Sequence, residues 1–272
     1  QFNKIVVDYF CETYKKGYTP NPCIVCNENI KFGYFLEKTK KLGADYLATG
    51  HYARVTYNKT KNKFFLKKGL DINKDQSYFL FSLNQQQLAS IKFPLGSYIK
   101  EEIKQKVLKL KLPVPIDKES QEACFILNRD YSELIRKTET KNSFKKGAVV
   151  LNDGTRVGEH NGIASYTIGQ RKGIGAYGHK MYVVDIVKKI NTVVIGQEED
   201  LYKTECIVEN LNWIGIENLE GKLVVDAKIR YRHKGTESEI FPIDKKTVKV
   251  IFKSPQKAVT PGQAVVFFKN DI

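Results

Sequence analysis

Two cysteines separated by two residues, Cys23 and Cys26, directly follow a Pro-Asn-Pro turn in the stretch TPNPCIVC. Pro20 and Pro22 fix φ and remove two backbone donors, so this stretch is not the interior of an ordinary helix. We expect Asn27 to cap a helix that begins there, which places both thiols near a helix N-terminus, where unpaired N–H groups favour the thiolate. The spacing indicates a reactive or metal-binding site, and the alternative is a pair of small buried hydrophobic residues.

A third cysteine, Cys124, occurs much later, in KESQEACFI, with Glu119 and Glu122 before it and Phe125 and Ile126 after it. Alone, such a cysteine is more often buried and inert, but with the earlier pair it can complete one site. Thiols that meet across a fold can carry sulfur as a persulfide, release it by disulfide formation and be reset by reduction. The same three cysteines could instead hold an iron–sulfur cluster or zinc. Zinc is the weaker hypothesis, because the sequence has no second Cys-x-x-Cys and no His-x₃₋₅-His.

The composition indicates a globular protein with an anionic partner. A length of 272 residues with 42% hydrophobic content is enough for two or three domains with proper cores. The formal net charge of +15 favours nucleic acid first and an anionic membrane second, and a lysine-rich proteome is the alternative explanation. Apolar runs such as AVVL and AVVFF are too short for a membrane span or a secretory leader, so we expect no membrane partner. Five cysteines, an odd number, favour a reducing cytoplasm.

The elements that position these cysteines alternate between helix and strand in the first half of the chain. A helix over Phe2–Tyr14 ends at Gly17, and a second, with Ile30, Phe32, Phe35 and Leu36 inward, ends at Gly43. A buried strand, Tyr46–Ala48, then runs into Gly50 and His51. This order predicts a parallel sheet with polar residues at the ligand-binding ends of its strands. We expect a lysine-rich hairpin next, at Thr56–Gly69. Three helical segments follow it: Asn73–Leu83, which Lys74, Asp75 and Gln76 open, then Asn84–Ile91 and Ser97–Leu110.

The second half of the chain has the pattern of β structure. The polar stretch Thr138–Lys146 predicts a domain boundary, and Gly147–Ile195 alternates apolar and polar residues around a hairpin signal at Asn152-Asp153-Gly154. Cys206–Ile272 is a run of short strands whose spacing predicts a small closed barrel. Two basic and aromatic clusters suit an RNA backbone. The first is Arg171 and Lys172 with Tyr177, for which an exposed basic turn is the alternative, and the second is Arg230 to His233.

Seven motifs occur along the chain in this order: TPNPCIVCNENIKF, GADYLATGHYARV, KDQSYFL, SQEACFI, YTIGQRKGIG, KIRYRH and TPGQAVVF. The bacterial and organellar tRNA-specific 2-thiouridylases have them in the same order, and the chain resembles this family over essentially its whole length. The resemblance implies an α/β fold: a partial adenine-nucleotide alpha-hydrolase-like (PP-loop ATPase) domain, a small mostly-β tRNA-binding domain and a C-terminal β-barrel. The corresponding boundaries are 1–137, 138–205 and 206–272.

The resemblance also implies an activity and its partners. Enzymes of this family use ATP, with Mg²⁺, to adenylate C2 of the wobble uridine in the tRNAs for Lys, Glu and Gln. A cysteine persulfide then delivers sulfur, and the products are 2-thiouridine, AMP and pyrophosphate. The implied partners are tRNA and a sulfur-donor or relay protein, and the implied location is the cytoplasm.

Matched motif by motif, Cys124 resembles the persulfide-bearing cysteine and Cys26 the nucleophile that closes a disulfide with it. Cys23 occupies an acid–base position that is aspartate in some members of the family. A cysteine there leaves that role open and would give an iron–sulfur cluster three ligands: Cys23, Cys26 and Cys124. Gly50 resembles an ATP-contacting glycine. The positions that resemble the family's tRNA contacts are Asn21, Pro22, Cys23, His51, Lys74, Asp75, Gln76, Arg230, Tyr231 and Gln263.

The chain departs from the family in one respect. A Ser-Gly-Gly-Val-Asp-Ser phosphate loop opens the family's ATP site, and these 272 residues do not contain it. We therefore expect that the chain alone does not adenylate tRNA, either as a fragment or as one polypeptide of a split enzyme. Two other classes of function stay open: a non-catalytic tRNA-binding module with structural cysteines, and an iron–sulfur-dependent thiolation enzyme.

Overall fold

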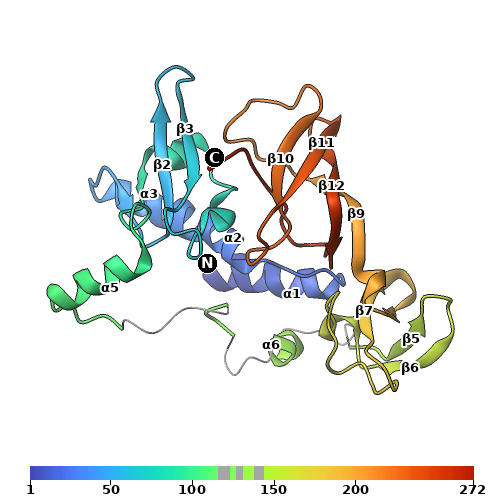
Figure 1. Cartoon of the computed structure of the whole chain (residues 1–272). Coiled ribbons are helices and arrows are strands. Elements are labelled where there is room, and N and C mark those ends of the chain that lie inside the picture. The colour runs from blue at the N-terminus through green and yellow to red at the C-terminus, as the bar shows by residue number, and fades with distance from the viewer. Residues whose placement is uncertain (116–122, 127–130, 138–143) are drawn as a thin grey trace.

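The computed structural model describes residues 1–115, 123–126, 131–137 and 144–272. A helical N-terminal part carries a β-hairpin, and two separate sheets follow it in the chain (Figure 1). The hairpin and the C-terminal sheet stand side by side above helix α1, and the middle sheet lies beyond the far end of that helix (Figure 1). This arrangement agrees with the predicted order of an α/β part, a β-rich middle and a C-terminal β domain.

The first helix confirms the prediction for Phe2–Tyr14. It consists of a π-helical segment η1 (Asn3–Val7) and α1 (Asp8–Lys15), and its apolar side, including Val6, Phe10 and Tyr14, is buried. Gly17 ends it with φ at +76°, and the backbone N–H of Tyr18 donates to the carbonyl of Thr13 (3.1 Å). A glycine in this left-handed conformation is the usual end of a helix, because it avoids the clash of a Cβ.

The helix after the cysteine turn begins earlier than predicted. It is one continuous run of α2 (Pro22–Val25), η2 (Cys26–Phe35) and α3 (Leu36–Lys41). Pro22 takes the first helical position, where a missing N–H costs nothing and the fixed φ suits the helix. Asn27 is therefore inside the helix rather than its cap: it is buried, and its side-chain N–H donates to the carbonyl of Phe79 (3.1 Å). The middle segment, η2, is a ten-residue π-helix, an unusual form that sequence periodicity does not reveal.

The inward face of this helix was only partly predicted. Phe32 and Leu36 are buried, whereas Phe35 is 55% exposed. The π-helical winding explains the difference, because its wider turn moves residues away from the positions that a 3.6-residue period assigns.

A short parallel pair and the hairpin complete the N-terminal part. β1 (Leu47–Ala48) pairs in parallel with β4 (Ile91–Lys92), as predicted, and β2 (Ala53–Asn58) forms an antiparallel hairpin with β3 (Lys63–Lys68). The helices that follow are shorter than expected: η3 (Ser77–Leu80), α4 (Gln85–Ala89) and α5 (Lys100–Lys109). The core that joins them comprises Phe32, Leu36, Leu47, Ala53, Leu66, Leu80, Leu83, Leu88 and Ile91.

The middle part is a four-stranded sheet in the order β6-β5-β8-β7. Its hairpin turns at Asn152-Asp153-Gly154, as predicted. The predicted boundary at 137/138 adjoins residues 138–143, which lie outside the described residues. The elements here are α6 (Tyr131–Lys137), β5 (Gly147–Leu151), β6 (Arg156–His160), η5 (Ile163–Ser165), β7 (Tyr182–Val187), η6 (Lys188–Ile190), β8 (Thr192–Gly196) and η7 (Glu199–Leu201).

The C-terminal strands form a five-stranded antiparallel sheet in the order β13-β10-β11-β12-β9. Their bounds are β9 (Tyr202–Glu209), β10 (Leu223–Lys228), β11 (Thr236–Asp244), β12 (Thr247–Lys257) and β13 (Val266–Phe268). β9 thus crosses the predicted boundary at 205/206. The order ends at β13 and β9, so within the described ranges no strand pair closes the barrel.

Each helix in those ranges is too short or too polar to cross a lipid bilayer.

Candidate functional site

The cysteine turn presents two free thiols at the start of a helix. Cys23 lies in the first turn of α2 and is exposed, and Cys26 begins η2 and is half-buried. The two residues before them are less accessible, since Asn21 is half-buried and Pro22 is buried. The turn can therefore offer thiols to a partner more readily than its proline ring.

The fold brings Cys124 to this turn. Phe125 packs edge-on against Phe10 of α1 and Phe2, with ring centroids 5.3 and 5.7 Å apart, and this contact holds the described segment 123–126 on the first helix. Cys124 itself is exposed. Loss of hydration raises the pKa of the Cys23 and Cys26 thiols, and the electrostatic influence of Cys124 adds to this rise. The preceding Glu119 and Glu122 lie outside the described residues.

The thiols of Cys23 and Cys26 lose their protons less readily than the thiol of a free cysteine. Loss of hydration raises the pKa of both Cys23 and Cys26, and the ammonium group of Lys31 acts against this rise. Lys31 lies five residues after Cys26 in the π-helix, where i→i+5 hydrogen bonds place it one turn away on the same side. Sequence reasoning missed this residue. Residues five apart, such as Cys26 and Lys31, lie on the same side of a π-helix but not of an α-helix, so only the structure shows that they are neighbours.

His51 is a neutral group in this site. It follows β1, is buried between the rings of Phe32 and Phe93 (centroids 5.8 and 5.7 Å), and shares a hydrogen bond between its Nδ1 and Thr49 Oγ1 (2.8 Å). Loss of hydration, helped by the charge of Lys31, lowers its pKa to about 4. At neutral pH the imidazole therefore carries no charge.

Gly50 lies at the carboxyl end of the parallel strand pair. The only atom near the position of a missing Cβ, among the described residues, is a methyl carbon of Leu95 at 3.7 Å, an ordinary contact distance. The packing of the protein therefore does not require a glycine there, and the space beside it is open. Open space at the carboxyl ends of parallel strands is where α/β folds bind ligands.

The segment with Lys74, Asp75 and Gln76 is tied to the backbone around His51. Asp75 is buried, and its carboxylate accepts hydrogen bonds from the backbone N–H groups of Gly69 (3.0 Å) and Ser77 (3.1 Å). Gln76 accepts at its side-chain oxygen from the N–H of Tyr52 (3.0 Å). Asp75 and Gln76 thus hold the backbone of neighbouring segments in place. Lys74 and Gln76 are half-buried.

Arg230 and Tyr231 follow β10 in a turn, not in the strand where the sequence pattern placed them. Tyr231 packs on Phe79 with ring centroids 4.4 Å apart, and Arg230 donates to the carbonyl of Lys257 (2.9 Å). Both are half-buried, so this basic and aromatic pair joins the C-terminal sheet to the helix η3 region.

Gln263 contacts the cysteine turn. Its side-chain N–H groups donate to the backbone carbonyls of Thr19 (3.0 Å) and Pro20 (3.1 Å). Of the positions that the sequence assigned to the site, Gln263 comes from farthest along the chain, and it lies beside Asn21 and Pro22. Arg230 and Tyr231 meet the N-terminal part at η3 instead.

Cys23, Cys26 and Cys124 are not arranged as metal ligands in the described part of the structure. Within the described part of the chain, no group of three or more His, Cys, Asp or Glu side chains is placed to hold a metal ion. An iron–sulfur cluster needs convergent thiolates, so the described geometry does not fit one.

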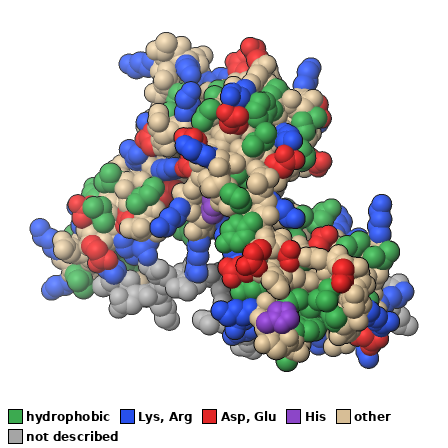
Figure 2. Space-filling model, turned by 45° about the vertical axis from the view of Figure 1, so that its right-hand side comes forward, with side chains coloured by type: hydrophobic (Ala, Val, Ile, Leu, Met, Phe, Trp, Pro, Cys, Tyr) green, Lys and Arg blue, Asp and Glu red, His purple; other side chains and the backbone are tan. Residues whose placement is uncertain are grey.

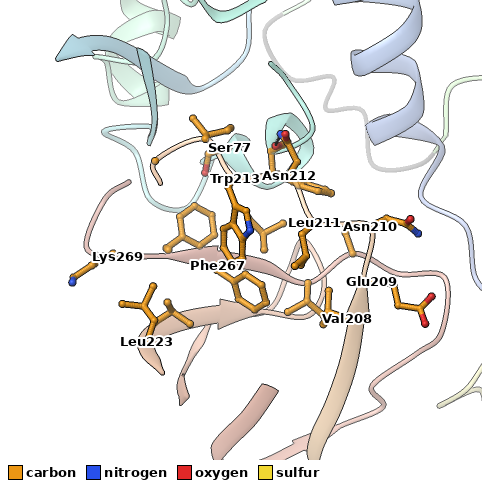
Figure 3. A pocket seen from close by; sticks show the side chains of 18 of the residues that line it. Ser77, Val208, Glu209, Asn210, Leu211, Asn212, Trp213, Leu223, Phe267 and Lys269 are labelled. Atoms are coloured by element: carbon orange, nitrogen blue, oxygen red, sulfur yellow. Dashed lines mark hydrogen bonds between the residues drawn. The ribbon is translucent and has the colours of Figure 1, made fainter. Parts of the chain in front are cut away.

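A cavity of about 1000 Å³ lies away from Cys23, Cys26 and Cys124, between the two end strands of the C-terminal sheet, and Cys206 of β9 is part of its wall. Trp213 lies beside Phe267 in it, with stacked rings 6.1 Å apart, and Leu223 and Val208 line the same space (Figure 3). Its wall also includes Tyr18 and the segment 259–268, which separates the cavity from the cysteine turn.

On the face that Figure 2 shows, positive charge is not concentrated in one patch. Figure 2 shows Lys and Arg side chains scattered over the face in view and interspersed with acidic ones. A scattered distribution suits contact with a long polyanion better than a pocket for one small anion.

Comparison with known proteins identifies the family. Three family models match the chain: a tRNA methyl transferase HUP domain over residues 1–128, a tRNA methyl transferase PRC-barrel domain over 138–197 and an aminomethyltransferase beta-barrel domain over 203–272. These descriptions confirm the predicted fold class, an α/β nucleotide-hydrolase-type domain followed by a β middle part and a C-terminal barrel.

Curated relatives match nearly the whole chain. The tRNA-specific 2-thiouridylase MnmA 2 of Thermoanaerobacter sp. (strain X514) is 50% identical over 268 residues, which cover 98% of this chain and 73% of the relative. MnmA of Acetivibrio thermocellus is 45% identical, with 100% of this chain and 76% of the relative covered. MnmA of Clostridioides difficile is 41% identical, with 100% and 75% covered. The chain belongs to the family of tRNA-specific 2-thiouridylases.

Proposed function

We propose that this chain carries the sulfur-transfer cysteines of an enzyme that converts a uridine of tRNA to 2-thiouridine, using ATP and a cysteine persulfide. One observation carries the proposal: Cys124, from a distant segment, lies within electrostatic reach of Cys23 and Cys26. Two thiols that approach each other across a fold can transfer a sulfur atom and then close a disulfide. The names of the relatives, tRNA-specific 2-thiouridylases, state the same reaction.

The reaction has two chemical stages. ATP adenylates the oxygen on C2 of the uridine and releases pyrophosphate. The terminal sulfur of a persulfide on Cys124 then attacks C2, and AMP leaves with the oxygen. The Cys26 thiolate attacks the Cys124 sulfur, which frees 2-thiouridine and leaves a Cys26–Cys124 disulfide. A two-electron thiol reductant restores both thiols, and a sulfur-donor or relay protein reloads Cys124.

The charges around the thiols support these roles. Loss of hydration keeps Cys26 protonated at rest, and Lys31 favours the thiolate when it is needed. The neutral His51 can accept or donate one hydrogen bond to the base without repelling Lys31. Cys23 is exposed and lies within electrostatic reach of Cys26 and Cys124, which supports an acid–base role there.

The nucleotide and the tRNA belong at different parts of the molecule. The open space beside Gly50 at the carboxyl ends of β1 and β4 supports adenosine binding there, and Mg²⁺ enters with the ATP phosphates. The scattered lysines and arginines support binding of tRNA, with the anticodon regions of the tRNAs for Lys, Glu and Gln as substrates. The cytoplasm, where tRNA and thiol reductants occur, is the proposed location.

The test uses a bacterial strain that lacks its own 2-thiouridylase and carries the natural gene for this protein. Mass spectrometry of the tRNA measures 2-thiouridine. We expect Cys124→Ser and Cys26→Ser to abolish it, because each removes one sulfur of the relay. The matched control is Cys206→Ser, on β9 and away from the turn, which is expected to leave thiolation unchanged. Normal thiolation with Cys124→Ser contradicts the proposal.

Two other functions predict different results. A non-catalytic tRNA-binding module predicts that neither serine variant alters thiolation, and identities of 41–50% to enzymes do not favour it. An iron–sulfur enzyme using Cys23, Cys26 and Cys124 predicts a brown anaerobic preparation that loses its iron in Cys23→Ser. We expect a colourless protein, because the described cysteines are not arranged as metal ligands.

A further inference from the structure

We propose that the turn Thr260–Gln263 of the C-terminal domain is a positioning element for the cysteine turn, and that Gln263 acts on sulfur transfer through the backbone of Thr19 and Pro20. The link to sulfur transfer rests on the proposed function. The positioning itself can be measured through the reactivity of the thiols, without tRNA or ATP.

The sequence Thr-Pro-Gly-Gln builds the turn. Pro261 and Gly262 occupy its two central positions, the N–H of Gln263 donates to the carbonyl of Thr260 (3.2 Å), and Gly262 has φ at +90°. These are the features of a type II turn, which needs proline first and a residue with positive φ second. The turn is therefore fixed by its own sequence before it meets the rest of the protein.

Gly262 also permits a close approach to the cysteine turn. A Cβ on Gly262 would lie 2.8 Å from the carbonyl oxygen of Thr19 and 2.9 Å from both its nitrogen and the Cβ of Tyr18. No side chain can occupy that space without moving the backbone, because backbone atoms at such a distance cannot rotate away. Positive φ and close contact thus require glycine for two independent reasons.

Hydrogen bonds across the contact hold the approach to α2. The N–H of Thr19 donates to the carbonyl of Pro261 (2.9 Å), and the side chain of Gln263 donates to the carbonyls of Thr19 and Pro20. Pro20 and Pro22 have no N–H group, so this connection between α1 and α2 has few bonds of its own. Its backbone is thus held from outside, three residues before Cys23.

A second contact lies just after Cys23. Ile24 packs in one buried cluster with Tyr78, Val266 and Phe268, and the hydroxyl of Tyr78 donates to the carbonyl of Ala264 (3.0 Å). The segment from Pro261 to Phe268 therefore contacts the chain on both sides of Cys23. The C-terminal domain fixes where helix α2 begins and where its thiols lie.

This placement separates two roles for Gln263. As a direct tRNA contact, it would contribute to binding and leave the free thiols unaffected. As a positioning residue, it spends both of its side-chain N–H groups on the protein backbone. Its loss then loosens the first turn of α2, restores water to the thiols and reverses part of the rise in their pKa.

The test measures alkylation by iodoacetamide at each cysteine, across a pH series and without tRNA, by peptide mass spectrometry. We expect Gln263→Ala to speed the reaction of Cys23 and Cys26 at pH 7.5 by about threefold to tenfold, a range that even one of the two lost hydrogen bonds can account for. Oxidation to the Cys26–Cys124 disulfide by a mild oxidant should slow, because the two thiols meet less often. Cys206 in the same molecules reports whether the C-terminal sheet stays folded, and its rate should not change.

Further variants complete the test. Gln105→Ala, an exposed glutamine on α5, is the matched control and should behave as the wild type. Gly262→Ala should shift the thiols in the same direction as Gln263→Ala and more strongly. In the thiolation reaction, Gln263→Ala should lower kcat and leave the KM for tRNA unchanged. Unchanged thiol reactivity together with a raised KM would overturn the proposal and make Gln263 a tRNA contact.

Discussion

At the scale of single residues, several polar side chains of the site act on the protein's own backbone. Asp75 and Gln76 bind the chain around Gly69 and Tyr52, and Gln263 binds the turn before the cysteines. Buried polar groups of this kind stabilise one local conformation, because leaving any of them unpaired costs free energy. The thiol chemistry therefore depends on groups that do not touch sulfur.

Lys31 is the residue whose charge we expect to matter most for Cys26. Lys31→Ala removes the cation that opposes the raised pKa of the Cys26 thiol, so less thiolate exists at pH 7.5 and alkylation should slow by about threefold. Rates are measured by iodoacetamide labelling across a pH series. Lys31→Arg should keep the wild-type profile, and Lys40→Ala, an exposed lysine on the same helical run, is the matched control. An unchanged profile in Lys31→Ala would show that the cation does not influence the thiol.

His51 should make the folded protein less stable in mild acid. Its pKa is about 4 in the folded protein against 6.5 ordinarily, so between these values the unfolded chain binds a proton that the folded chain does not. The free energy of unfolding therefore falls as pH decreases through this window, by about 2 kcal/mol between pH 7 and pH 4.5 from this group.

Urea unfolding of the wild type and of His51→Gln at both pH values isolates this effect. The wild type should lose about 2 kcal/mol more than the variant over the same pH interval. A constant destabilisation by the substitution does not matter, since only the change with pH is compared. Equal losses in both proteins would mean that His51 titrates normally.

At the scale of elements, the π-helix η2 is the feature that organises the site. It places Lys31 above Cys26 and turns Phe35 toward solvent. A side chain from another helix supports it: Gln87 of α4 donates to the carbonyls of Glu28 (3.2 Å) and Phe32 (3.0 Å). These bonds link the cysteine helix to the core around β1 and β4.

Removing this support should destabilise the helix. Gln87→Ala deletes both bonds to η2 and the side-chain oxygen that accepts from the N–H of Asn84, the reciprocal half of the α4 cap. We expect the free energy of unfolding to fall by about 1–3 kcal/mol, measured by urea denaturation. Gln86→Ala, at the exposed neighbouring position, should change it by less than about 0.5 kcal/mol. Similar losses in both variants would argue against a specific role for Gln87.

At the scale of the whole molecule, the cysteine site lies where the N-terminal helices meet the C-terminal sheet. The tRNA methyl transferase and aminomethyltransferase models match separate stretches of chain, and the contact between Gln263 and Thr19 joins two of them. Lys and Arg side chains, in contrast, are scattered over the face of the molecule that Figure 2 shows. Positioning of the thiols is therefore local to one interface, whereas attraction of RNA depends on many scattered charges.

The distributed charge predicts a strong dependence of tRNA binding on salt. Each phosphate that a Lys or Arg neutralises releases counterions, so the affinity should fall by about 10³-fold between 50 and 200 mM salt if six phosphates are contacted. Filter binding or fluorescence anisotropy with unmodified tRNA measures this. Lys40→Ala and similar single variants should reduce the slope only slightly. An affinity that does not depend on salt would contradict binding through the phosphate backbone.

The order of elements, the first helix with its glycine end, the parallel sheet and the β2–β3 hairpin followed from the sequence, and the reactivity of the cysteines stays a prediction. Each rests on local patterning: apolar periodicity, a glycine that takes positive φ, turn residues and thiol spacing. The early start of the cysteine helix was also within reach, since Pro22 suits a first helical position. The predicted cap at Asn27 is wrong, because the helix begins at Pro22 and Asn21 is the residue that flanks it.

Only the tertiary structure decided which side chains meet. The π-helical winding that aligns Lys31 with Cys26, the approach of Cys124 and the contact of Gln263 with Thr19 all join positions whose proximity no local pattern encodes. A π-turn is unfavourable by itself and exists where contacts such as those of Gln87 support it. Long-range contacts depend on how apolar faces pack, and burial then sets the pKa values of Cys26 and His51.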